Sequence, residues 1–115
     1  MAEPTLQKFF VYAPDYTDEG TFQRRMSVRP KHLEKIAELK NAGKIRVGGV
    51  LLSPESVETA DAEKKIIGST LICEYENIGQ VREMIESDIY WSSNIWDKER
   101  LVILPFVPAI PTPFP

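Results

Sequence analysis

Blocks of apolar residues separated by polar turns follow one another along the 115-residue chain, and the pattern within each block predicts its structure. Aromatic and β-branched residues fill positions 7–13, and Pro14 follows directly, a pattern that favours a strand. Three later segments have the same character. We therefore predict four strands in all, over residues 7–13, 44–52, 66–76 and 99–107.

Two segments carry apolar residues at helical spacing. Pro30 is expected to open the first helix and Gly43 to close it, with residues 21–28 as a shorter helical or irregular lead-in. Asn77 is predicted to cap the second helix, with Gln80 as its capping-box partner. The expected buried positions are Leu33, Ile36, Ala37 and Leu39 in the first helix and Ile78, Val81, Met84 and Ile85 in the second.

The remaining segments predict connections. Residues 53–65 are polar and indicate an exposed loop, whereas residues 88–96 form an aromatic-rich connection. Gly48 and Gly49 fall inside a predicted strand, which suggests a bulge or a close approach of the backbone. Five of the nine prolines lie from Pro105 onward, so this end should be extended. We expect one domain over residues 1–107 and a proline-rich tail over residues 108–115.

The predicted order strand–helix–strand–strand–helix–strand is that of a ferredoxin-like α+β fold, a four-stranded antiparallel sheet with both helices on one face. Adjacent apolar residues such as Phe9 and Phe10, or Leu71 and Ile72, place apolar groups on both faces of this sheet. No further element is available to cover the second face. We therefore expect two copies to pair through it as a homodimer.

Composition excludes several classes of function. A net charge of −3 with both signs scattered gives no basic surface for nucleic acid. One cysteine allows no intrachain disulfide and suits a reducing compartment. No secretory signal and no run of about 20 apolar residues is present, so we expect a cytoplasmic protein that binds no membrane. One histidine and one cysteine do not build the usual nitrogen–sulfur metal site, so no metal is expected.

His32 is the only histidine and falls in the first turn of the expected first helix, at the edge of its apolar stripe. Unpaired backbone N–H groups and the helix dipole favour a neutral imidazole there. A neutral imidazole can serve as a general base. The alternative is a structural histidine bonded to a nearby carbonyl.

Most polar residues close to His32 in the expected fold could have either a functional or a structural role. Asp15 follows the first strand and could bond one imidazole nitrogen, or serve only as a turn residue. Arg25 and Arg29 could bind an anionic substrate, or form surface ion pairs. Ser69 could donate a hydrogen bond. Tyr90 could wall a pocket for a flat ligand, or belong to a dimer interface.

Several of these residues stand in stretches that resemble the YciI-like (YCII-related) family. The similarity includes Phe10-Val11-Tyr12-Ala13-Pro14-Asp15, and Arg25-Met26-Ser27-Val28-Arg29-Pro30-Lys31-His32-Leu33. It continues in Gly68-Ser69-Thr70, in Asp88-Ile89-Tyr90, where the family usually has Asp-Pro-Tyr, and in Leu104-Pro105-Phe106. The resemblance covers roughly residues 7 to 107.

The resemblance implies a dimeric α/β barrel and a His–Asp pair, which would be His32 and Asp15 here. It suggests a cofactor-independent lyase or isomerase that dehydrates, decarboxylates, dehalogenates or isomerises a small cyclic or aromatic compound. His32 would move the proton, Asp15 would orient it, and Arg25, Arg29, Ser69 and Tyr90 would bind the substrate. A non-catalytic small-molecule-binding or accessory protein and a purely structural dimer are the alternatives.

Overall fold

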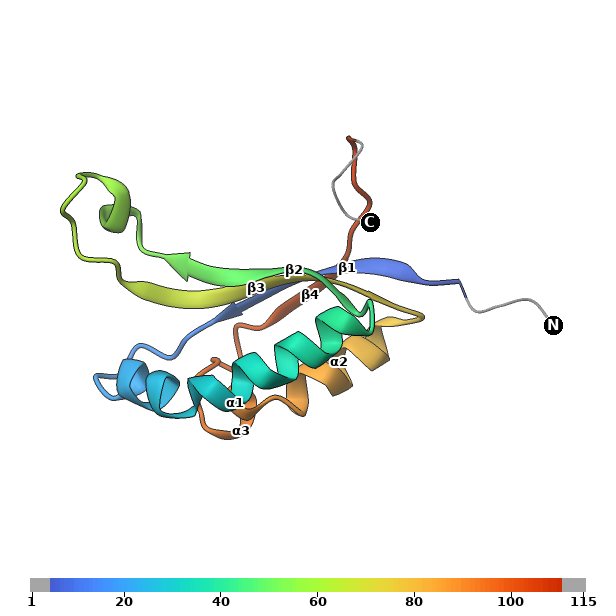
Figure 1. Cartoon of the computed structure of the whole chain (residues 1–115), viewed down its shortest axis with the longest axis horizontal. Coiled ribbons are helices and arrows are strands. Elements are labelled where there is room, and N and C mark those ends of the chain that lie inside the picture. The colour runs from blue at the N-terminus through green and yellow to red at the C-terminus, as the bar shows by residue number, and fades with distance from the viewer. Residues whose placement is uncertain (1–4, 111–115) are drawn as a thin grey trace.

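The computed structural model of the protein describes residues 5–110. All four predicted strands and both predicted helices are present in the expected order, together with two short helices in the connections (Figure 1). The elements are β1 (Gln7–Pro14), α1 (Thr21–Asn41), β2 (Ile45–Leu52), the 3₁₀ helix η1 (Pro54–Val57), β3 (Ile66–Tyr75), α2 (Ile78–Glu86), α3 (Ile89–Ser92) and β4 (Val102–Pro105).

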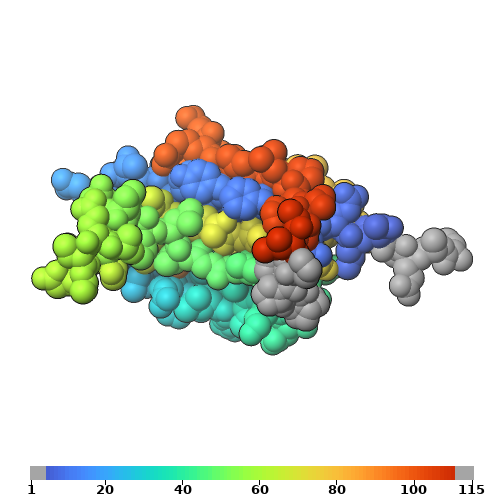
Figure 2. Space-filling model, turned by 90° about the horizontal axis from the view of Figure 1, so that it is seen from above, coloured from blue at the N-terminus to red at the C-terminus, as the bar shows by residue number. Residues whose placement is uncertain are grey.

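The strands form one antiparallel sheet in the order β2-β3-β1-β4, which confirms the ferredoxin-like α+β fold. The helices α1, α2 and α3 lie on one face of this sheet (Figure 1). Figure 2 looks onto the other face, where the strands lie side by side and no helix covers them. Phe10, which pairs with Ile72 of β3 and Leu104 of β4, stands on this uncovered face.

The core lies between the sheet and the helices. Alternate residues of β1 point into it, so Phe9, Val11 and Ala13 are buried while Lys8, Phe10 and Tyr12 are only half-buried. The second helix contributes Val81, Met84 and Ile85 as predicted. Ile78 was also predicted to be buried, but it lies in the first turn of α2 and is 48% exposed.

The first helix begins nine residues earlier than predicted. α1 runs without interruption from Thr21 to Asn41, and Pro30 lies inside it instead of opening it. Proline costs a helix one hydrogen bond, but contacts with the core hold both halves of α1 in place. Its buried residues are polar (Thr21, Arg25 and His32). Leu33 and Ala37, which were predicted to be buried, are exposed.

Other boundaries agree more closely. The side chain of Asn77 accepts a hydrogen bond of 2.9 Å from the backbone N–H of Gln80, as predicted for a cap. The Gln80 side chain reaches back to the N–H of Glu76, one residue before the cap. β4 is shorter than predicted, since its pairing ends at Pro105. No helix within residues 5–110 is long and apolar enough to cross a membrane.

The proline-rich tail is described only in part. Residues 106–110 are not helical, in agreement with the prediction, and residues 111–115 lie outside the described residues. The boundary between domain and tail at residue 107 stays a prediction.

Candidate active site

A buried ion pair joins the end of β1 to the start of α1. Nε and Nη2 of Arg25 donate to the two carboxylate oxygens of Asp15, both over 2.9 Å. Arg25 is 1% exposed and Asp15 is 5% exposed. The predicted hydrogen bond between Asp15 and His32 is therefore wrong, because both oxygens of Asp15 bind Arg25 instead.

His32 has a different carboxylate partner. Its Nδ1 lies 2.9 Å and 3.0 Å from the two carboxylate oxygens of Asp88, the residue that precedes α3. Asp88 is itself fixed, because it caps α3 and accepts a hydrogen bond of 2.8 Å from the backbone N–H of Tyr90. Asp88 was not among the predicted site residues, although Asp88-Ile89-Tyr90 belongs to the family resemblance.

The Asp88 contact assigns the tautomer of His32. A carboxylate only accepts hydrogen bonds, so the proton of a neutral imidazole must sit on Nδ1. Nε2 then carries the free lone pair. No protein group within residues 5–110 hydrogen-bonds Nε2, and His32 lines a cavity. In the neutral ring, Nε2 is therefore the nitrogen that can accept a hydrogen bond.

Aromatic rings hold the imidazole in place. His32 stacks on Tyr90 with 3.8 Å between ring centroids and 10° between ring planes. Trp96 makes a T-shaped contact with the same imidazole, with 5.8 Å between ring centroids. The Arg25 guanidinium lies 4.7 Å from the centroid of the Tyr90 ring. Desolvation by burial raises the pKa of Tyr90, so its phenol keeps its proton. Tyr90 can donate a hydrogen bond but does not compete with His32 as a base.

Ser69 links the ion pair to the aromatic cluster. Its hydroxyl oxygen accepts hydrogen bonds of 2.8 Å from Nη2 of Arg25 and 3.2 Å from Nε1 of Trp96. Gly68 lets β3 come this close to β1, because a Cβ there would lie only 2.9 Å from the carbonyl oxygen of Ala13. With both lone pairs engaged, the hydroxyl proton of Ser69 is left to donate elsewhere.

These residues surround a cavity of about 310 Å³ between α1 and the strands β2 and β3. Arg29 stands on its wall, is exposed, and has no carboxylate within ion-pair distance in the part of the chain that the structure describes. Arg25 is occupied by Asp15 and Ser69, so Arg29 is the arginine available to an anionic ligand. The cavity lining includes Arg25, Arg29, His32, Gly48, Ser69, Leu71, Tyr90 and Trp96.

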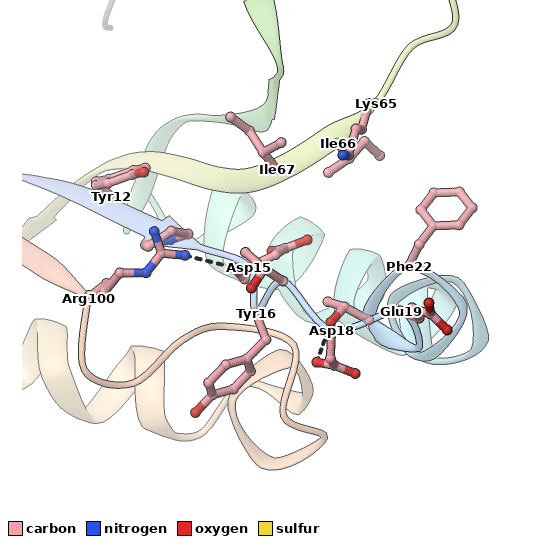
Figure 3. A pocket seen from close by; sticks show the side chains of 13 residues that line it. Tyr12, Asp15, Tyr16, Asp18, Glu19, Phe22, Lys65, Ile66, Ile67 and Arg100 are labelled. Atoms are coloured by element: carbon pink, nitrogen blue, oxygen red, sulfur yellow. Dashed lines mark hydrogen bonds between the residues drawn. The ribbon is translucent and has the colours of Figure 1, made fainter.

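A second hollow of about 450 Å³ lies where β1 ends and β3 begins, and Asp15 borders it (Figure 3). In Figure 3 the guanidinium of Arg100 lies between Tyr12 and Asp15, and its Nη2 donates to the backbone oxygen of Asp15 over 3.0 Å. The other side of Arg100 binds Asp97, whose pKa it lowers. This hollow has no counterpart of the His32–Asp88 pair.

Cys73 does not belong to either cavity. It is a fully buried residue of β3, and burial raises the pKa of its thiol to about 12. A thiol with that pKa holds almost no thiolate near neutral pH, so it is a poor nucleophile. Cys73 is therefore a core residue of the sheet.

Comparison with known proteins identifies the family of this chain. The family model of the YCII-related domain matches residues 9–106. The chain belongs to the YCII-related domain family. The similarity predicted from the sequence is thus confirmed, and the match runs from within β1 to just beyond the end of β4.

Relatives of this YCII-related domain include proteins of similar length. Protein YciI of Escherichia coli O6:H1 is 28% identical over 98 residues, which cover 85% of this chain and 94% of the relative. Fusaric acid biosynthesis protein 2 of Gibberella moniliformis is 29% identical over 101 residues, which cover 88% and 93%.

A solved structure shares both fold and sequence with this YCII-related domain. It is a 5-chloro-2-hydroxyhydroquinone dehydrochlorinase from Burkholderia phenoliruptrix AC1100, in complex with 2,5-dihydroxybenzoquinone. The TM-score is 0.70 at 26% identity, and the match covers 87% of this chain and 93% of the other. A lyase-type enzyme that binds a small molecule is therefore among the structural neighbours of this chain.

Proposed function

We propose that this protein is a cofactor-independent lyase or isomerase that acts on a small cyclic or aromatic compound by proton transfer. The observation that carries the proposal is the His32–Asp88 pair, which holds the imidazole through Nδ1 at the wall of a cavity that His32 lines. The dehydrochlorinase among the structural neighbours supports the reaction class. Its ligand, 2,5-dihydroxybenzoquinone, supports a hydroxylated six-membered ring as the substrate.

His32 would act as the general base. Its Nε2 accepts a proton from the ligand, and the Asp88 carboxylate stabilises the imidazolium that forms. Asp88 would thus take the orienting role that was predicted for Asp15. The stacked Tyr90 ring keeps the imidazole at one angle throughout the transfer.

The remaining polar residues would bind the substrate. Arg29 has a free guanidinium, which matches a phenolate or carboxylate group. Ser69 has one proton to donate to a ligand oxygen, since both of its lone pairs are engaged. Arg25 is bound by Asp15, so it would contribute fixed positive charge beside the ring of Tyr90.

Elimination of HCl illustrates how these groups would work together. Nε2 of His32 takes a hydroxyl proton and returns it to the ring carbon that bears chlorine, so that this C–O bond becomes C=O. A second hydroxyl proton is then removed, its electron pair forms the second C=O and shifts the ring double bonds, and the carbon–chlorine bond breaks with its own electron pair as chloride leaves. An isomerisation would use the first step and return the proton to a different carbon.

The direct test offers the purified protein 5-chloro-2-hydroxyhydroquinone and other hydroxylated monocyclic compounds. Product formation is followed by chloride release, absorbance and mass spectrometry. We expect turnover of at least one ring compound without any added cofactor. Binding that raises the melting temperature without product formation would contradict the enzymatic proposal and favour a small-molecule-binding protein.

We also propose that the protein is a homodimer built on the uncovered face of the sheet. Phe10, Tyr12 and Ile72 occupy this face and are only half-buried in the single chain. Burial of such a face against a second copy removes apolar area from water, at roughly 25 cal/mol per Å². A second copy would therefore cover the strands seen in Figure 2 with a gain in free energy.

Light scattering should give twice the chain mass of 13.1 kDa at micromolar concentration. Replacing Phe10 with glutamate should halve that mass, because a buried charge has no partner in the interface. Ile78→Glu is the matched control, since Ile78 is 48% exposed in α2 on the opposite side of the sheet, and it should stay dimeric. A wild-type mass of one chain would contradict the dimer.

A further inference from the structure

The glycine pair of β2 is not explained by backbone conformation. Most of the other residues of this strand are branched aliphatic side chains, as strands prefer. Gly43 is the only glycine with positive φ within residues 5–110, so Gly48 and Gly49 have backbone angles open to any residue. Glycine inside a strand often marks a close approach of a ligand or of another backbone. The cause must lie in the space around each position.

The two glycines face opposite sides of the sheet. Gly48 pairs with Leu71, a core residue on the helix-covered face, and Gly49 pairs with Thr70 on the uncovered face. A Cβ on Gly48 would lie 3.1 Å from Cδ2 of Leu71 and 3.7 Å from Cγ2 of Ile45. A Cβ on Gly49 would meet no atom within 4 Å.

Gly48 and Gly49 both border the His32 cavity, but only a Cβ on Gly48 would stand on the helix-covered face of the sheet. The cavity separates α1 from β2, with His32 and Arg29 on the helix side and Gly48 on the strand side. A side chain at position 48 would have Leu71 already in contact on one side, so its further atoms would extend into the cavity. The missing side chain therefore keeps open the gap between the helix and the edge strand.

We propose that Gly48 determines which ligands the cavity accepts, by leaving room for a flat six-membered ring between α1 and the backbone of β2. This inference rests on the proposed function, because it concerns the ring that His32 would deprotonate. The preferred ligand class is a monocyclic hydroxylated ring. A side chain at position 48 would exclude that ring sterically without altering the His32–Asp88 pair or Arg29.

The test compares Gly48→Ala with Gly49→Ala, which adds the same methyl group to the other face of the same strand. The probe is 2,5-dihydroxybenzoquinone, and its Kd is measured by isothermal titration calorimetry. We expect Gly48→Ala to weaken binding about tenfold, because overfilling a packed site carries that order of cost. Gly48→Val should weaken it further, and Gly49→Ala should stay within about twofold of the wild type.

Circular dichroism, melting temperature and light scattering of each variant establish that fold and assembly are unchanged. Wild-type affinity in Gly48→Ala, or an equal loss in Gly49→Ala, would overturn the role of Gly48 and leave the proposed function intact. If the wild-type protein binds and converts no ring compound, the proposed function fails, and the inference fails with it.

Discussion

Replacing His32 with glutamine should lower kcat for the ring compound that the wild-type protein converts by about 10²- to 10⁴-fold, the usual contribution of a general base. Glutamine can still donate an N–H toward Asp88, so the fold should survive. It offers no basic nitrogen to the cavity. The measurement is steady-state turnover at saturating substrate, together with the melting temperature of each protein.

Lys31→Gln is the control for this variant. Lys31 precedes His32 on the same helix but is exposed and has no contact with the cavity. It should keep the wild-type kcat. A His32→Gln protein that folds, binds and turns over like the wild type would exclude His32 as the base.

Replacing Asp15 with alanine should cost about 3–5 kcal/mol of the free energy of unfolding, because it leaves the buried Arg25 guanidinium without a counter-charge. The pair is almost inaccessible to water, so solvent does little to compensate for the lost partner. Ser69 would be the only other acceptor near Nη2 of Arg25. Urea denaturation followed by circular dichroism measures the loss.

Asp18→Ala supplies the matched comparison. Asp18 also binds an arginine through both oxygens, at 2.7 Å and 3.0 Å from Arg24, but that pair lies in solvent. Exposed ion pairs contribute little, so the loss should be much smaller. Equal losses for the two variants would show that burial of the Asp15–Arg25 pair has no energetic consequence.

The sequence predicted the fold closely because its signals were local. Strand residues ran in short apolar blocks, Asn77 supplied a helix cap, and Pro14 ended the first block. Such signals depend only on neighbouring residues. The segment 21–28 had no comparable signal, since the residues that hold it are the polar Thr21 and Arg25. Their partners lie elsewhere in the chain.

The error in the start of α1 explains the error in the partner of His32. If the helix began at Pro30, His32 would lie close to the end of β1 and to Asp15. Because α1 begins at Thr21, His32 lies eleven residues, or about 16 Å, along the helix axis. Arg25, one turn from that start, is the residue that meets Asp15.

The sequence contains only a weak signal that Asp88 is the partner of His32. It is 56 residues from His32, so no spacing rule connects the two. The family resemblance includes Asp88-Ile89-Tyr90, but the aspartate predicted to pair with His32 was Asp15. Only the packing of α3 against α1 decides between Asp15 and Asp88.

The state of the His32 ring tests the central claim most directly. Because His32 is the only histidine, a long-range ¹H–¹⁵N spectrum of the labelled protein contains a single imidazole. We predict that the neutral form of the ring carries its proton on Nδ1, and that the Nε2 resonance shifts when 2,5-dihydroxybenzoquinone is added. A proton on Nε2, or an Nε2 signal unmoved by saturating ligand, would contradict the account.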